Sequence, residues 1–280
     1  MFPYVLILPA SALVFAVALY PMFYAFHLSL HESALMVTGE FVGFENYWRL
    51  ISDPASWWNM TASLIFVAGS VFLAVGLGLA LALLLNQRIA FRTTFRTGIL
   101  VPWVVSQVVA AMVWRWLLNA DYGPVSMALL DLGLPRLDPL GDPRFAMAAL
   151  ILTNVWRSVA FPMILLLAAL QGIPENLYRA ARVDGVSWFT TLTRVTIPML
   201  RPTLLVCVIV LTLSDFNIVA LPLVLTGGGP LDSTDLISLR LYREAFTYFN
   251  MDTASAIAII LFFVNVLLTF AYLASMRGRR

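Results

Sequence analysis

The stretch that decides the fold is residues 174–198, which read PENLYRAARVDGVSWFTTLTRVTIP. This segment is polar, carries arginines, favours a helix and lies between two long apolar runs. A membrane protein usually joins adjacent spans by a few residues, so an amphipathic connector of 25 residues indicates a docking element for an aqueous partner. The alternative is a surface helix that merely anchors the loop.

The composition identifies the solvent of this chain as a lipid bilayer. Of its 280 residues, 61% are hydrophobic and 11% are charged, whereas a soluble domain carries about 25% charged residues. The single cysteine, Cys207, lies within an apolar run, where a small buried hydrophobe is its expected role.

Apolar runs long enough to cross a bilayer, about 20 residues each, occur six times. The first lacks the basic start and small-residue cleavage site of a signal peptide, so it is read as a span. The sequence therefore predicts an all-α, polytopic protein in which residues 1–280 form one transmembrane domain. The expected spans are roughly 3–29, 60–86, 98–118, 145–171, 199–222 and 254–275.

The arginines predict the orientation. Six spans place both termini on one side, and the loops of that side carry ten arginines against five on the other. Basic loops stay in the cytosol, so both termini are expected to be cytosolic. The loops at about 30–59, 119–144 and 223–253 then lie outside, each long enough for a short interfacial helix. The ten arginines are Arg88, Arg92, Arg96, Arg179, Arg182, Arg194, Arg201, Arg277, Arg279 and Arg280.

Small residues in the second expected span predict close helix contacts. They are Gly69, Ala74, Gly76, Gly78 and Ala80.

Catalytic chemistry is not expected. The glycine-rich stretch 227–230 lacks the Lys-Ser/Thr of a phosphate-binding loop and reads as a turn after the fifth span. His27 and His31 stand four residues apart, without further ligands nearby, and an interfacial hydrogen-bonding role is expected rather than a metal site. The sequence predicts no catalytic residue, no metal and no means of hydrolysing ATP.

The connector has the signals of two short helices. Pro174 suits a first helical turn and Glu175 suits the positive helix N-terminus. Gly185 can end the helix in a left-handed conformation, and a second helix is expected from about Ser187, with Pro198 marking the start of the fifth span. The result would be a helix–turn–helix along the membrane surface. Residues Leu177, Ala180, Ala181 and Asp184 share a face of the first helix.

The spacing within the connector resembles a family signature. Ala180-Ala181, three residues, Gly185, nine residues and then 195–198 (Val-Thr-Ile-Pro) resemble the "EAA" loop of ABC-importer permeases, which contacts the ATPase. The whole chain resembles the carbohydrate-type permeases of the maltose/glycerol-3-phosphate group. The stretches 154–156 (Asn-Val-Trp), 173–174 (Ile-Pro) and 225–230 (Leu-Thr-Gly-Gly-Gly-Pro) also match that group.

This resemblance implies a set of partners. It implies a second homologous permease, two ATPase subunits that bind ATP and Mg, an extracytoplasmic solute-binding protein, and a bacterial plasma membrane location. It implies no cofactor in this chain and no nucleic acid. Arg179 stands where the motif usually has glutamate, so a salt bridge made by that glutamate cannot be carried over. The expected ATPase-coupling residues are Glu175, Tyr178, Arg179, Ala180, Ala181, Asp184 and Gly185.

Polar groups within the spans mark a pathway, because they are costly in hydrocarbon unless paired or hydrated. Four residues of the fourth span fall at i, i+3, i+4 and i+7, on one helical face. Asparagine, arginine and serine can bind sugar hydroxyls, and phenylalanine can cover a C–H face. The site implied by the resemblance, with Asp215 added from its position, comprises Asn154, Arg157, Ser158, Phe161, Ser214, Asp215 and Asn217.

The alternative is that these groups only join helices through hydrogen bonds, with Arg157 paired to Asp215. Gln107 and Arg115, in the third span, are weaker candidates, and Arg115 can instead reach the outer interface.

The predicted function is the permease subunit of an ATP-driven oligosaccharide importer working by alternating access. The same machinery could import glycerol-3-phosphate or a glycerophosphodiester, since Arg157 can bind a phosphate bidentately. A rival is an ion-coupled secondary transporter with Asp215 as its cation site. A scaffold or receptor subunit that moves no solute is a third possibility.

Overall fold

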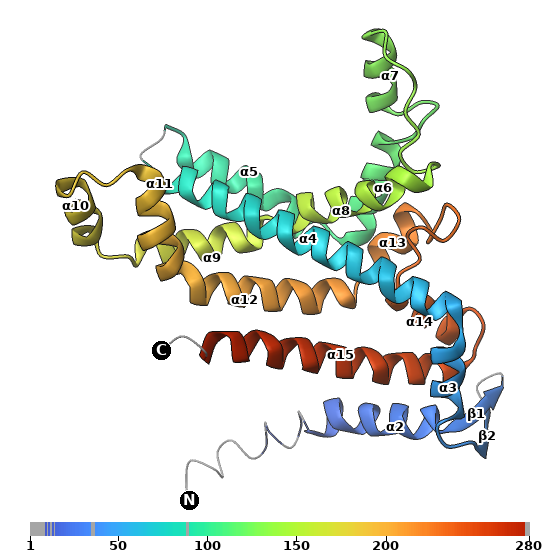
Figure 1. Cartoon of the computed structure of the whole chain (residues 1–280). Helices are drawn as coiled ribbons and strands as arrows, with labels where there is room; N and C mark the ends of the chain where they lie inside the picture. Colours follow the sequence, from blue (N-terminus) through green and yellow to red (C-terminus); the bar gives the residue numbers. More distant parts are fainter. Residues whose placement is uncertain are drawn as a thin grey trace, which may run out of the picture. The chain divides into compact units, whose positions relative to one another are not determined.

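The computed structural model describes residues 15–34, 37–87 and 90–277, together with positions 9, 11 and 13. It is mostly helical (Figure 1). The chain divides into two compact units, one made of Met1–Thr61 and Leu236–Leu267, the other of Ala62–Asp235 and Leu268–Arg280. Arg88, Arg279 and Arg280, three of the arginines that predict the orientation, lie outside the described residues.

Among the described residues, three unbroken helical stretches are long and apolar enough to cross a membrane. They are α4 (Pro54–Asn86), the stretch Trp188–Phe216, and α15 (Met251–Arg277). These stretches contain most of the expected spans 60–86, 199–222 and 254–275. The fifth expected span ends earlier than predicted, because the helix stops at Phe216 and a separate short helix, α13 (Ala220–Leu225), follows.

The expected span 98–118 is broken into two helices, and whether the pair crosses the membrane as one span stays a prediction. Helices α5 (Arg92–Val104) and α6 (Gln107–Leu117) meet at an angle of 100°. Pro102 removes one helical hydrogen bond near the end of α5. Val105 and Ser106 are then extended, and the Ser106 side chain caps α6 by accepting a hydrogen bond from the Val109 N–H.

The expected span 145–171 is also divided, more gently. Helices α8 (Pro143–Ser158) and α9 (Ala160–Gln171) are bent by 45° at Val159. Pro162 explains the bend, since its ring opposes the carbonyl four residues earlier and it has no N–H to donate. The helical path continues through the bend, and the Val159 N–H bonds to the Val155 carbonyl.

The first expected span, 3–29, falls largely outside the described residues. Its described part is a short π-helix, η1 (Phe15–Leu19), followed by α2 (Tyr20–Ser29). Counting each bent pair as one span gives up to five spans in the described part of the chain. The count of six therefore stays a prediction.

The unit that contains the first residues also holds a small hairpin that the sequence did not predict. Strands β1 (His31–Ala34) and β2 (Val37–Phe41) pair antiparallel, and α3 (Glu45–Ser52) follows. The buried Asn46 donates hydrogen bonds to the carbonyls of Ser29 and His31, which ties α3 to the base of the hairpin. His31 Nδ1 lies 2.8 Å from the His27 carbonyl, as expected for a hydrogen-bonding pair.

The same unit is fastened by Arg240 of α14 (Ile237–Phe246). Arg240 forms a 2.8 Å ion pair with Asp53 and donates to Ser56 Oγ and Asn59 Oδ1. Burial alone would raise the pKa of Asp53, but hydrogen bonds from Arg240 and the Ala55 N–H, with the charge of Arg240, bring that pKa below its ordinary value. This network fixes α14 to the first turn of α4.

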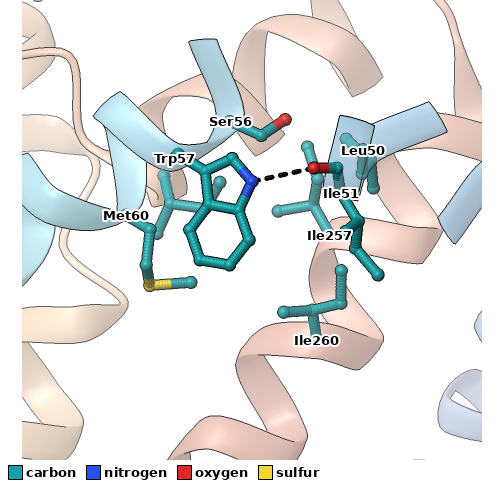
Figure 2. Close-up of a pocket in the computed structure, with 8 residues that line it drawn as sticks. Leu50, Ile51, Ser56, Trp57, Met60, Ile257 and Ile260 are labelled. Carbon is teal, nitrogen blue, oxygen red and sulfur yellow. Dashed lines mark hydrogen bonds between the residues drawn. The ribbon is translucent and has the colours of Figure 1, made fainter. Parts of the chain in front are cut away.

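An apolar pocket lies beside this network (Figure 2). Trp57 forms one wall, and its indole N–H donates a 2.8 Å hydrogen bond to the Ile51 carbonyl near the end of α3. The bond satisfies a helix-end carbonyl that has no partner within the helix. The other residues that line the pocket are Leu50, Ser56, Met60, Ile237, Ile257 and Ile260.

The second unit is assembled around α8 and α9, where two glycines of α4 allow close contact. A Cβ at Gly69 would lie 2.8 Å from Ile151, and one at Gly78 would lie 2.8 Å from Pro162. The prediction of close helix contacts is confirmed at these two positions, whereas Gly76 faces open space. The buried cluster of this unit comprises Ala82, Leu85, Met163, Leu166, Leu167, Leu170, Ile173, Leu200 and Cys207.

Candidate functional site

The connector contains a helix where the sequence predicts one, α10 (Glu175–Val183). Gly185 adopts the left-handed conformation with φ +66°. Its N–H bonds to the Arg182 carbonyl, and the Val186 N–H bonds to the Ala181 carbonyl. This pair of bonds is the Schellman arrangement, which a residue with a side chain enters only with strain. The predicted glycine cap is confirmed.

The second connector helix differs from the prediction. Ser187 caps it by accepting a hydrogen bond from the Thr190 N–H, but α11 (Trp188–Thr191) runs without interruption into α12 (Ile197–Phe216). The link is a π-helical segment, η2 (Leu192–Thr196), in which the Ile197 N–H bonds to the Leu192 carbonyl five residues earlier. The wider turn admits Pro198 without breaking the helix, so the continuous helical path starts before Pro198, at Trp188.

Only part of α10 contacts the rest of its unit. Ala181 is buried, and Tyr178 is half-buried with its hydroxyl 3.3 Å from Thr196 Oγ1. The other predicted coupling residues, Glu175, Arg179, Ala180, Asp184 and Gly185, are exposed. Arg179 forms a 3.1 Å ion pair with Glu175 one turn earlier. Arginine at this position therefore stabilises α10 itself.

Large apolar side chains remain exposed around this connector. They are Leu177, Val183, Val186, Trp188 and Phe189. Behind α10 lies a cavity of about 210 Å³, walled by the end of α4, the end of α9 and the turns 188–196. An amphipathic helix with exposed aromatic neighbours and space behind it is suited to contact a protein in the aqueous phase.

The predicted intramembrane site is centred on one hydrogen bond. The Asn154 amide of α8 donates to Asp215 Oδ1 of α12 at 3.0 Å, and both side chains are buried. The alternative pairing of Arg157 with Asp215 is not formed, since the described residues contain no ion pair between them within 4.0 Å. Asparagine, not arginine, satisfies the carboxylate.

Three further polar atoms beside this bond have no partner within the described chain. They are Asn154 Oδ1, Arg157 Nε and Ser158 Oγ, and each is buried. Buried polar groups of a native protein are nearly always hydrogen-bonded. Three orphaned atoms within five residues of one helix end therefore mark a place where water, a partner or a solute completes the bonding.

The predicted stripe of the fourth span does not form one uniform face. Asn154 and Ser158 are buried, whereas Arg157 and Phe161 are half-buried and lie on either side of the bend at Val159. Across from them, Ser214 and Asn217 are exposed, and the Asn217 amide donates to the Leu213 carbonyl of its own helix. The residue of α12 that meets Asn154 is thus Asp215, and neither Ser214 nor Asn217 is bonded to it.

Two aromatic pairs near this site were not predicted. Trp103 of α5 lies 6.4 Å from Phe161 between ring centroids, and Trp114 of α6 lies 5.7 Å from Trp156. The abundance of tryptophan in these spans was the only signal in the sequence. Of the weaker candidates, Arg115 donates to the Val224 carbonyl at 3.2 Å and so joins α6 to α13.

Spanning helices, a buried polar pair and an amphipathic connector define a membrane-embedded transport subunit. Residues 74–280 match the family described as binding-protein-dependent transport system inner membrane component. The chain belongs to this family, and the resemblance drawn from the connector and its flanking motifs is confirmed.

Relatives and solved structures agree over nearly the whole chain. The trehalose/maltose transport system permease of Thermococcus litoralis is 36% identical over 99% of this chain and 94% of its own length. The sulfoquinovosyl glycerol permease of Agrobacterium fabrum is 32% identical over 98% and 90%. A bacterial alginate ABC transporter, solved with a periplasmic protein bound to an alginate pentasaccharide, has a chain of the same fold. That chain matches with a TM-score of 0.86, at 23% identity over 99% of this chain and 94% of its own.

Proposed function

We propose that this chain is the permease subunit of an ATP-driven sugar importer that takes an oligosaccharide from an extracytoplasmic binding protein. The observation that carries the proposal is similarity over the full chain to a permease named for trehalose and maltose. A second homologous permease and two ATPase subunits would complete the importer, and the ATPases would bind ATP and Mg. Both termini of this chain would lie in the cytosol of a bacterial cell.

In this proposal α10 is the coupling helix. Its exposed face, including Glu175, Arg179, Ala180, Asp184 and Gly185, would contact the ATPase, while Tyr178 and Ala181 hold α10 against its own unit. Because η2 joins α11 to α12 without a break, a displacement of the connector would move α12 directly. Asp215 lies at the far end of α12, so the same displacement would reach the polar pair.

The solute site would form beside that pair, between this chain and the second permease. The orphaned atoms of Asn154, Arg157 and Ser158 supply an acceptor, a donor and a hydroxyl, the mixture that sugar hydroxyls require. Ser214 and Asn217 are exposed on this chain, as residues of a shared cavity would be. Phe161 would cover an apolar face of the sugar.

A phosphorylated solute is the second candidate, favoured by one observation, the unpartnered Nε of Arg157. A guanidinium binds phosphate through two parallel hydrogen bonds. An ion-coupled carrier is less favoured, because the Asp215 carboxylate already accepts a hydrogen bond from a neutral amide and the connector would have no role.

Reconstitution separates these functions. The chain would be co-expressed with its partner subunits, placed in proteoliposomes with its binding protein, and tested with maltose, trehalose and glycerol-3-phosphate. ATP-dependent uptake of a neutral sugar is expected. Uptake driven by an ion gradient without ATP would refute the importer. Uptake of glycerol-3-phosphate, with no uptake of maltose or trehalose, would refute the proposal that the solute is a neutral sugar.

Orientation has its own test. Thr93→Cys and Ser233→Cys, each in a Cys207→Ser background, would be treated with an impermeant thiol reagent outside intact cells. Labelling at position 233 and not at 93 is expected, and the reverse pattern would overturn the proposed topology.

A further inference from the structure

A second cavity lies at the opposite end of α12 from the connector, away from the orphaned atoms of α8. It measures about 300 Å³, the lower end of the range of small-molecule sites, roughly 300–1,000 Å³. Figure 1 shows α6 and α13 beside each other at this place, and the two helices pack together. The cavity is lined by Arg115, Leu118, Asn119, Ala120, Asp121, Asp138, Leu140, Gly141, Leu225 and Thr226.

The cavity walls are fixed by hydrogen bonds. Asn119 Oδ1 accepts from the N–H groups of Asp121 and Tyr122, which shapes the turn after α6. Asp138 Oδ1 accepts from the Gly141 N–H and shapes the opposite wall. Ser126 of α7 (Pro124–Asp131) is buried and donates to the Leu137 carbonyl, so the segment between the two turns folds back on itself.

The polar lining keeps unused hydrogen-bonding capacity. Within the described chain, the Asn119 NH₂ group and the second carboxylate oxygens of Asp121 and Asp138 make no hydrogen bond. Arg115 uses one of its five donors, on the Val224 carbonyl. Free donors and free acceptors therefore both line one small space, and sugar hydroxyl groups require both.

Charge favours a neutral ligand in this cavity. The lining carries one positive charge, on Arg115, and two negative charges, on Asp121 and Asp138. Asp121 forms a 3.0 Å ion pair with Arg136, which does not line the cavity. With Arg136 included, the two arginines and the two aspartates balance, so neither an anionic nor a cationic solute gains a net attraction here. A neutral polyol meets no net charge.

The position connects this cavity to the proposed solute site. Helix α13 begins three residues after Asn217 and ends at Leu225, which lines the cavity. A helix of six residues spans about 9 Å. The cavity therefore lies one short helix beyond the last residue of the proposed site, on the side that the arginine distribution predicts to be outside the cell.

We infer that this cavity is a sugar-binding subsite at the outer mouth of the permease, occupied by a neutral saccharide as it leaves the binding protein. It deepens the proposed importer function and rests on it. Arg115 and Asn119 would donate to sugar hydroxyls, and Asp121 and Asp138 would accept from them.

One pair of variants isolates this role. Asp121→Asn and Arg136→Gln both remove the same exposed ion pair, but only Asp121 lines the cavity. Asp121→Asn is expected to raise the KM for uptake of the transported sugar roughly tenfold, the effect of weakening one hydrogen bond to a charged group. Arg136→Gln should leave that KM unchanged. Equal effects of the two variants, or no effect of Asp121→Asn, would overturn the inference.

The competing interpretation is that the binding protein docks on this cavity. Measurements of ATP hydrolysis distinguish protein docking from sugar binding. If sugar binds here, Asp121→Asn should leave unchanged the concentration of sugar-loaded binding protein that half-stimulates ATP hydrolysis. A tenfold rise in that concentration would assign the cavity to protein docking and refute the sugar subsite.

Thiol protection provides a test independent of transport. Ala120→Cys, which lines the cavity, and Leu132→Cys, which is exposed elsewhere on the same segment, would be made with Cys207→Ser. The transported sugar, added at millimolar concentration without binding protein, should slow alkylation at position 120 and not at position 132. Equal rates of alkylation at position 120 with and without sugar would refute the subsite and leave the proposed function intact. A wild-type complex that imports no sugar would refute the proposed function.

Discussion

The amide of Asn154 and the carboxylate of Asp215 are joined by a 3.0 Å hydrogen bond between buried side chains that stand 61 residues apart. The bond connects α8 to the end of α12, the helix continuous with the connector. A displacement of the connector, transmitted along α12, would therefore reach the proposed solute site at this bond.

Removing one partner of this bond should destabilise the protein. Asn154→Ala leaves a buried carboxylate without its donor, at a cost of about 1–3 kcal/mol. The double variant Asn154→Ala/Asp215→Ala removes both polar groups and should recover most of that stability, measured as thermal unfolding of the purified complex. If Asn154 also binds solute, uptake should stay low in the double variant. Normal uptake in it would mean that the pair only joins the helices.

Arg157 discriminates between solutes. Its Nε has no partner within the described chain, so a phosphate could engage its planar fork fully. With a neutral sugar, Arg157→Ala should reduce kcat/KM for uptake by roughly tenfold, the loss of one hydrogen bond to a charged group. With a phosphorylated solute the same variant should abolish uptake. Arg157→Lys, which keeps the charge and loses the fork, is the matched control and should resemble the wild type only for a neutral sugar.

Gly185 should control coupling rather than membrane insertion. Gly185→Pro removes the N–H that bonds to the Arg182 carbonyl and forbids the positive φ, so the end of α10 must rearrange. ATP hydrolysed per sugar imported should rise several-fold, as coupling weakens. Gly172→Ala, at the end of α9, has an ordinary negative φ and serves as the control. An unchanged ratio in Gly185→Pro would count against α10 as the dock.

Asp53 should contribute a stability that depends on pH. Its carboxylate is bonded to Arg240, and its pKa in the folded protein is below the ordinary value. The contribution is therefore fully present above the unfolded pKa, about 3.9, and is lost as pH falls through the lower folded value. The Tm difference between wild type and Asp53→Asn should be constant between about pH 5 and 8 and narrow below pH 4. A difference that grows with acidity would contradict the assigned ion pair.

The sequence by itself determined the solvent, the fold class, the family and the connector helix. Hydrophobic content and the length of the apolar runs require a bilayer whatever tertiary contacts the helices make. The cap at Gly185 depends on the local backbone preference of glycine. Proline positions also carried local information, because Pro102 and Pro162 lie beside the two breaks that divide the expected spans 98–118 and 145–171. Run length alone cannot reveal such breaks, since both halves stay apolar.

Only the tertiary structure decided which polar groups meet. The spacing placed Asn154, Arg157, Ser158 and Phe161 on one face of a straight helix, but the bend at Val159 and the packing against α12 bury two of them and leave two half-exposed. The residue spacing also could not show whether Asn154 or Arg157 bonds to Asp215. That choice depends on the rotation of two helices about their axes, which is set by side-chain packing between residues far apart in the chain.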